Sequence, residues 1–220
     1  MMGAGAGAMA VGAYALLRPQ GAPELPLLPQ AANAQQAEAP AGEAPEVLEM
    51  VLGDDDAPVE VIEYASFTCP HCRTFHQNTL PQIKANYIDT GLVRFVSREV
   101  YFDRFGLWAG MVARCAGPDR YFGIVDLIYE GQAEWTQGAP GEVAENLRRI
   151  GRTAGISNEQ LEACLTDAEM AQALIANYEA NMEVHDIPGT PHFVIDGEMH
   201  SNMSYDDFAA ILDERVAAAQ

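Results

Sequence analysis

Residues 59–72, VEVIEYASFTCPHC, begin as a strand and end as the first turn of a helix. Val59 to Phe67 is rich in β-branched and aromatic residues, which favour extended backbone. Proline suits the first position of a helix, because its φ angle is already helical and its missing N–H would be unpaired there. Pro70 therefore predicts a helix that continues to about Asp89. Because proline also removes a hydrogen bond from a helix interior, we expect a kink at Pro81.

Two further strands flank this unit. Thr90-Gly91 ends the predicted helix, and the apolar residues of Leu92 to Tyr101 predict the next strand. A strand–helix–strand unit of this kind pairs its two strands in parallel. On the N-terminal side, Val47 to Leu52 predicts a short strand, and Gly53 to Pro58 predicts a solvated turn.

Residues 103–183 change to a helical period, which Gly117-Pro118, Gly138 to Gly141 and Gly155 interrupt. Two capping boxes mark helix starts inside this block, Ser157 with Gln160 and Thr166 with Glu169. The block is therefore predicted to be wholly helical.

The C-terminal part returns to strand. Pro191 to Ile195 and Glu198 to Ser201 predict two strands joined by a hairpin turn at Asp196-Gly197, and Ser204 with Asp207 caps a final helix. The fold class is α/β, an open sheet with an all-helical insertion. We predict a first part of the sheet domain at 46–102, the insertion at 103–183 and the second part of the sheet domain at 184–220.

The N-terminal segment and the charge bear on location. Gly3 to Leu17 is a short apolar run typical of a signal peptide, and Gly21 to Pro45 is a Pro-, Ala- and Gln-rich linker. Residues 1–45 are thus predicted to be either a cleaved signal, with Ala32 to Ala34 as the cleavage motif, or an uncleaved anchor. The formal net charge is −20, from 12 basic and 32 acidic residues, which disfavours binding to nucleic acid.

Cys69, Pro70, His71 and Cys72 form the chemical motif, at the point where a strand gives way to a helix. At the N-terminal end of the helix, unpaired N–H groups and the helix dipole stabilise a thiolate at Cys69. A protonated His71 would add positive charge beside the sulfur and make the disulfide more oxidising. Cys72, one turn further in, is the resolving thiol. A substrate thiolate would attack Cys69 and form a mixed disulfide, which a second substrate thiol resolves.

Glu63 and Thr190-Pro191 are two further candidates. Glu63 lies on the strand before Cys69, where it either serves as a buried proton acceptor near Cys72 or points to solvent at a strand edge. X-Pro bonds are the ones that adopt the cis form, although most are trans. A cis bond before Pro191 would turn backbone groups toward an extended substrate beside Cys69.

The remaining cysteines and histidines have more than one interpretation. Cys115 and Cys164 form either a structural disulfide, which we favour in an exported protein, or two buried thiols. Cys69, Cys72 and His76 resemble part of a zinc site, but no fourth ligand is evident, and we predict no metal. His192 and His200 alternate with apolar residues and are predicted to face solvent.

Aromatic residues recur around the start of the helical block and inside it. Core packing is their default role, although some could line a substrate groove. The residues are Phe102, Phe105, Trp108, Tyr121, Phe122 and Trp135.

The strand ending in EYASFT (63–68), the CPHC motif (69–72), the helical insertion and GTPHFVIDG (189–197) together resemble the DsbA-like thiol:disulfide oxidoreductases of the thioredoxin superfamily. The resemblance covers residues 46–220 and implies that Cys69 is the nucleophile, Cys72 the resolving thiol and Glu63 the buried acid. It also implies that Thr190-Pro191 is a cis-proline loop that faces the disulfide. The best-known oxidases carry valine where this chain has Thr190.

The resemblance further implies a periplasmic protein that oxidises reduced or unfolded exported proteins and is itself reoxidised by a membrane partner of the DsbB type. We expect no bound cofactor, no nucleic-acid partner and a monomer. The nearest alternative is a reductase or isomerase that uses the same site in the other direction. A metal-carrying thiol module is the alternative from another class.

Overall fold

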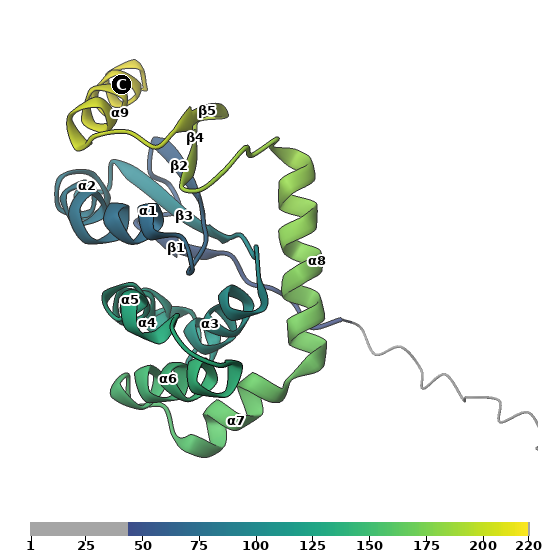
Figure 1. The fold of residues 1–220 in the computed structure, drawn as a ribbon. Coiled ribbons are helices and arrows are strands. Elements are labelled where there is room, and N and C mark those ends of the chain that lie inside the picture. The colour runs from purple at the N-terminus through teal and green to yellow at the C-terminus, as the bar shows by residue number, and fades with distance from the viewer. Residues whose placement is uncertain (1–43, 220) are drawn as a thin grey trace, which may run out of the picture. The chain divides into compact units, whose positions relative to one another are not determined.

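The computed structural model describes residues 44–219, and Figure 1 shows how their helices and strands are arranged. Nearly all of the predicted signal or anchor segment, residues 1–45, lies outside this range. The described strands form one sheet in the order β1-β3-β2-β4-β5. Their bounds are β1 Met50–Leu52, β2 Val59–Ala65, β3 Val93–Glu99, β4 His192–Ile195 and β5 Glu198–Ser201.

The parallel pairing of β2 with β3 is confirmed, with Val59 opposite Val93 and Ala65 opposite Glu99. β1 and β4 pair antiparallel with the outer sides of these two strands. The predicted hairpin is confirmed as well, since β4 and β5 pair antiparallel around Asp196 and Gly197. Both turn residues have positive φ, +47° and +85°, as a tight two-residue hairpin turn requires. β2 is thus the central strand of the sheet. Its carboxyl end leads through residues 66–68 to Cys69.

Helices cover both faces of the sheet. One face packs against the segment after Cys69 and against α9, through a cluster that includes Phe75, Phe193 and Phe208. Tyr178 and Met182 of α8 pack on the other face, and Figure 1 shows α8 running from the helical part up to the sheet. The helices are α1 Pro70–Thr74, α2 Leu80–Ile83, α3 Arg104–Arg114, α4 Pro118–Glu130, α5 Gln132–Trp135, α6 Pro140–Thr153, α7 Asn158–Thr166, α8 Ala168–Val184 and α9 Tyr205–Ala218, with π-helical segments η1 Phe75–Thr79 and η2 Lys84–Ile88.

The helical segment after Cys69 departs from regular α-helix just before Pro81. Here η1 separates α1 from α2, and the N–H of Leu80 donates to the carbonyl of Phe75, five residues back. Pro81 then occupies the first turn of α2, where its missing N–H is tolerated. The interruption expected at this proline therefore takes the form of a π-helical segment.

Helices α3 to α8 fill the predicted helical block and break at the expected glycines and prolines. Ser157 caps α7 by accepting a hydrogen bond from the N–H of Gln160. The predicted cap at Thr166 is wrong, because Asp167 caps α8 through the N–H of Met170. The Thr166 hydroxyl instead donates to the carbonyl of Glu162, one turn back in α7. Among residues 44–219, no helix combines the length and apolar character that a membrane span needs.

Candidate active site

Cys69 is the N-cap residue of α1, with an extended backbone at φ −83° and ψ 121°. Its N–H donates to the carbonyl of Ser66 at 3.1 Å, and its carbonyl accepts from the N–H of Arg73 at 3.2 Å. Pro70 occupies the first turn of α1, as the sequence predicts. This arrangement places the Cys69 sulfur at the end of the helix where N–H groups are unpaired.

The two thiols of the motif have opposite electrostatic environments. Both cysteines are free; Cys69 is half-buried, and Cys72 is fully buried. Hydrogen bonding from the Cys72 thiol lowers the pKa of Cys69 to about 5, assisted by Thr190 and by the N–H groups of Cys72 and His71. Burial raises the pKa of Cys72 far above its ordinary value, and the nearby Glu63 carboxylate adds to this effect. At neutral pH, Cys69 is therefore a thiolate and Cys72 a thiol.

His71 acts on Cys69 through its backbone N–H. Its imidazole is exposed to solvent. The pKa of Cys69 is thus lowered by the Cys72 thiol, by Thr190 and by N–H groups of the helix terminus, while a contribution of the charged His71 imidazole stays a prediction.

The loop before β4 faces Cys69. The Thr190–Pro191 peptide bond is cis, and the thiol of Cys69 donates to the carbonyl of Thr190 at 3.3 Å. The hydroxyl of Thr190 is buried and has no hydrogen-bond partner among the described residues. When Cys69 loses its proton, this hydroxyl is available as a donor to the thiolate.

Glu63 is completely buried on β2 and pairs with His76 of η1, whose Nε2 lies 2.9 Å from Oε2 of Glu63. Tyr129 of α4 stacks on the imidazole with ring centroids 4.3 Å apart. A buried Glu63 is one of the two predictions from the sequence, whereas His76 is predicted only as a possible metal ligand. The usable signal was the need of a buried carboxylate for a partner, together with the position of His76 one helical turn after Cys72.

The region that contains these site residues is similar to known proteins. A family model described as Thioredoxin matches residues 46–214. This chain belongs to the thioredoxin family. A crystal structure of Wolbachia pipientis alpha-DsbA1 superposes with a TM-score of 0.72 at 26% identity, covering 80% of this chain and 94% of that one. The predicted fold, thioredoxin-like with a helical insertion, is thereby confirmed.

Two sequence relatives agree with this assignment. A Rickettsia bellii protein named as a protein-disulfide oxidoreductase is 34% identical over 169 residues, which are 76% of this chain and 64% of that protein. Disulfide bond formation protein D of Bacillus subtilis is 27% identical over 176 residues, 76% of each chain. The match therefore spans slightly less than two thirds of the rickettsial relative.

In this DsbA-like chain, the helical part also holds the active-site loop in place. The side-chain amide of Gln132 donates to the carbonyls of Phe67 and Cys69, at 2.8 and 2.9 Å. The hydroxyl of Tyr129 donates to the carbonyl of Ser66 at 3.3 Å. None of these three hydrogen bonds had a sequence signal, because each joins residues more than sixty positions apart.

Cys115 and Cys164 are joined by a disulfide with an S–S distance of 2.04 Å. The bond links the C-cap of α3 to α7. The side-chain amide of Gln160 donates to the carbonyl of Cys115 at 2.8 Å and supports the same junction.

No described histidine completes a metal site with the two active-site cysteines. Within residues 44–219, no group of three His, Cys, Asp or Glu side chains is arranged to hold a metal ion. The prediction that His192 faces solvent is wrong, since its exposed fraction is 6%. Both faces of β4 are covered, and burial together with the nearby His200 lowers the pKa of His192.

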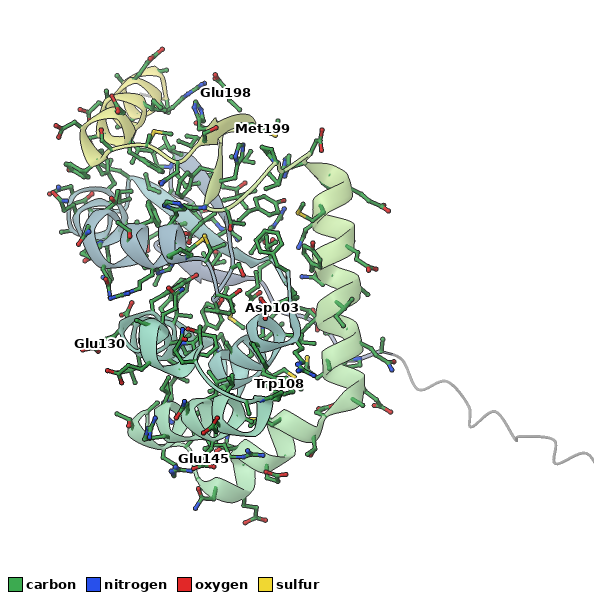
Figure 2. All side chains as sticks on the ribbon, in the orientation of Figure 1. Asp103, Trp108, Glu130, Glu145, Glu198 and Met199 are labelled. Carbon is green, nitrogen blue, oxygen red and sulfur yellow. A yellow bond between two sulfur atoms is a disulfide. The ribbon has the colours of Figure 1, made fainter. Side chains whose placement is uncertain are left out.

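The aromatic residues divide between core and surface. Tyr121 and Trp135 are buried as expected, but Phe102 is 60% exposed. The guanidinium of Arg104 lies over the rings of Phe105 and Trp108. Figure 2 shows Asp103 between the sheet and the helices. Asp103 accepts a hydrogen bond from the Thr68 hydroxyl at 2.8 Å, so this aromatic segment begins beside the residue that precedes Cys69.

The pKa of Cys69 predicts a pH profile for alkylation. In the reduced folded protein, the rate of modification by iodoacetamide should rise through about pH 5 and reach a plateau below neutrality, because only the thiolate reacts. Cys72 should remain unmodified, since it is buried and its pKa is raised. The same measurement on urea-unfolded protein should give a midpoint near the ordinary cysteine value of about 8.5. A folded-state midpoint near that value would contradict the assignment of Cys69 as a stabilised thiolate.

Proposed function

We propose that this chain is a protein thiol:disulfide oxidoreductase that donates the Cys69–Cys72 disulfide to reduced exported proteins. The observation that carries the proposal is the opposite shift of the two cysteine pKa values, to about 5 for Cys69 and far upward for Cys72. The names of the sequence relatives and the likeness to alpha-DsbA1 support the same class of reaction.

The reaction begins with a substrate thiolate, which attacks the Cys69 sulfur of the disulfide. A substrate–Cys69 bond forms, the Cys69–Cys72 bond breaks, and its electron pair passes to Cys72, which takes up a proton. A second substrate thiolate then attacks the substrate sulfur and expels Cys69 as a thiolate. The substrate leaves with a disulfide, two electrons poorer, and the protein is left as a dithiol. Cys69, with a pKa of about 5, is a good leaving group in this second step.

The direction of transfer follows from the linkage between pKa and stability. The Cys69 pKa is lower in the folded reduced protein than in the unfolded chain, so ionisation stabilises the folded reduced form increasingly as pH rises from about 5 to about 9. The raised pKa of Cys72 opposes folding only above its unfolded value, outside that window. The disulfide form receives no such stabilisation. Reduction of the Cys69–Cys72 disulfide is therefore favoured, which makes this disulfide a stronger oxidant than one between cysteines of ordinary pKa.

The partners of this reaction are also proposals. The substrate would be a reduced or unfolded exported protein, whose extended backbone could contact the Thr190 region beside Cys69. The oxidised state would be restored by a membrane partner of the DsbB type. We place the protein in the periplasm, as a monomer whose residues 1–45 are a signal or an anchor. The exchange takes place between cysteine pairs and needs no bound cofactor.

The experiment that tests the proposal is the reduction potential of the Cys69–Cys72 pair. The full chain is equilibrated with glutathione buffers of graded composition, and the fraction of oxidised pair is read by alkylation and mass. We expect a potential well above the value of thioredoxin, roughly −270 mV. A value near or below that of thioredoxin would overturn the oxidase assignment and favour the reductase or isomerase direction.

A further inference from the structure

If the proposed exchange takes place, Cys72 must gain and lose a proton in every cycle. It becomes a thiolate when the Cys69–Cys72 bond breaks, and its raised pKa requires that it be protonated at once. Its side chain is fully buried, with an exposed fraction of 0%. Solvent therefore cannot deliver this proton directly, and a buried group must carry it.

Glu63 and His76 form a connected pair beside this thiol. The charge of Glu63 raises the pKa of Cys72, which places its carboxyl within electrostatic reach. Oε2 of Glu63 is bonded to Nε2 of His76, and the side chains of the pair are 0% and 2% exposed. Oε1 of Glu63 and Nδ1 of His76 are both buried and have no hydrogen-bond partner among the described residues. Each side chain thus keeps one polar atom free beyond the bond that joins them.

His76 also lines a surface pocket of about 360 Å³. Its remaining lining residues, Gln77, Pro81, Asp126, Tyr129 and Glu130, come from the segment after Cys69 and from α4, and all except Tyr129 are exposed. Figure 2 shows Glu130 projecting at the molecular surface on this side. A polar space of this size admits water. His76 therefore contacts both a buried carboxyl and a pocket large enough to hold water.

We propose that His76 carries protons between this pocket and Glu63, the buried acid that the family resemblance already pairs with Cys72. When the disulfide is attacked, a proton passes from Nε2 of His76 to Glu63, Glu63 gives a proton to the Cys72 thiolate, and the imidazole is reprotonated from the pocket. When Cys72 is deprotonated for reoxidation, each transfer runs in reverse. His76 touches no substrate atom and acts through Glu63.

The surroundings of His76 suit this role. The titratable groups that contact His76 or line the same pocket are Glu63 of β2 and Asp126, Tyr129 and Glu130 of α4. Desolvation raises the pKa of Asp126, and His76 opposes this rise, so the two side chains interact across the pocket. Tyr129 stacks on the imidazole and donates its own hydroxyl to Ser66, which holds the ring in one orientation.

The test compares His76→Gln with His76→Ala in single-turnover reduction of the disulfide by dithiothreitol. Glutamine can still donate to Glu63 but cannot relay a proton. We expect both variants to react roughly 100-fold or more slowly than the wild type, within the usual range for lost proton transfer. Each variant's rate is divided by the wild-type rate at the same pH, between about 5 and 8. This division cancels the effect of the reductant's own titration. Gln77→Ala is the matched control, because it alters the same pocket without removing a titratable group, and it should react at the wild-type rate.

Added imidazole separates a relay from a structural role. At constant pH and ionic strength, it should accelerate His76→Ala, whose missing ring opens the pocket toward Glu63. It should leave His76→Gln and the wild type unchanged. His76→Gln at the wild-type rate throughout the pH range would overturn the inference, and so would a slow His76→Ala that imidazole does not rescue. If His76→Ala does not fold, the rate of His76→Gln decides alone. A wild-type chain without any exchange would instead refute the proposed function itself.

Discussion

Cys72→Ser is expected to retain about one glutathionyl group per chain on Cys69 after exposure to oxidised glutathione, whereas the wild type should release it. The Cys69 thiolate attacks one sulfur of the glutathione disulfide and expels a glutathione thiolate. In the wild type, Cys72 then attacks the Cys69 sulfur and closes the internal disulfide. Serine cannot take this step, but its hydroxyl can still donate to Cys69, so the first attack should remain fast. Intact mass and a non-reducing gel measure the adduct.

The control for this experiment is Cys69→Ser. It retains Cys72, which is fully buried and whose pKa is far above neutrality, so no adduct should form. The Cys72→Ser variant should also be unable to donate a disulfide to any reduced protein, because it cannot form one at this site. Release of glutathione from Cys72→Ser, or an adduct on Cys72 in Cys69→Ser, would contradict the assignment of attacking and resolving thiols.

Local sequence patterns were enough to predict much of the fold. The unit from Val59 to Glu99 follows from a β-branched run, a proline at a helix start and a second apolar run, each of which acts over a few residues. The predicted caps at Ser157 and Ser204 are confirmed, since both accept the expected N–H. The cap at Thr166 is wrong because Asp167, one residue later, is the better N-cap acceptor, although only Thr166 has the capping-box spacing to Glu169.

His192 shows where this kind of reasoning fails. Alternation along a strand distinguishes two faces but does not say whether both are covered. Phe193 and Ile195 pack under α9, while Val194 packs under α8, so β4 has no solvent face. The cover on the second face comes from a helix that precedes β4 in the chain, and its placement is a property of the tertiary fold.

The candidate site likewise has one part that the sequence predicts and one part that it does not. Placement of Cys69 at a helix terminus follows from Pro70 alone, because the proline fixes the start of the helix. By contrast, the contacts of Glu63 with His76 and of Gln132 with Cys69 depend on how separate elements pack together. Such partners could be expected in kind, since buried polar groups need them, but not by residue number.

Removal of the second disulfide, by Cys115→Ala with Cys164→Ala, is expected to lower the free energy of unfolding by about 4 kcal/mol. The bond closes a loop between residues 49 positions apart. Opening that loop gives the unfolded chain conformational freedom that the disulfide denies it, and the folded chain gains little. For a protein of this length, the loss corresponds to a fall in Tm of roughly 8–16 °C.

Urea unfolding of the variant and of the wild type measures this effect, with the Cys69–Cys72 pair reduced in both so that only the second disulfide differs. The matched control is Gln160→Ala, which removes the 2.8 Å hydrogen bond to the Cys115 carbonyl and leaves the covalent link intact. This side chain is exposed, and its loss should cost about 1 kcal/mol or less. A deficit in the double variant no larger than that of Gln160→Ala would show that the hydrogen-bonded junction between α3 and α7 already restricts the chain. The large expected difference rests on the opposite premise, that the hydrogen bond exists only in the folded state while the disulfide also constrains the unfolded one.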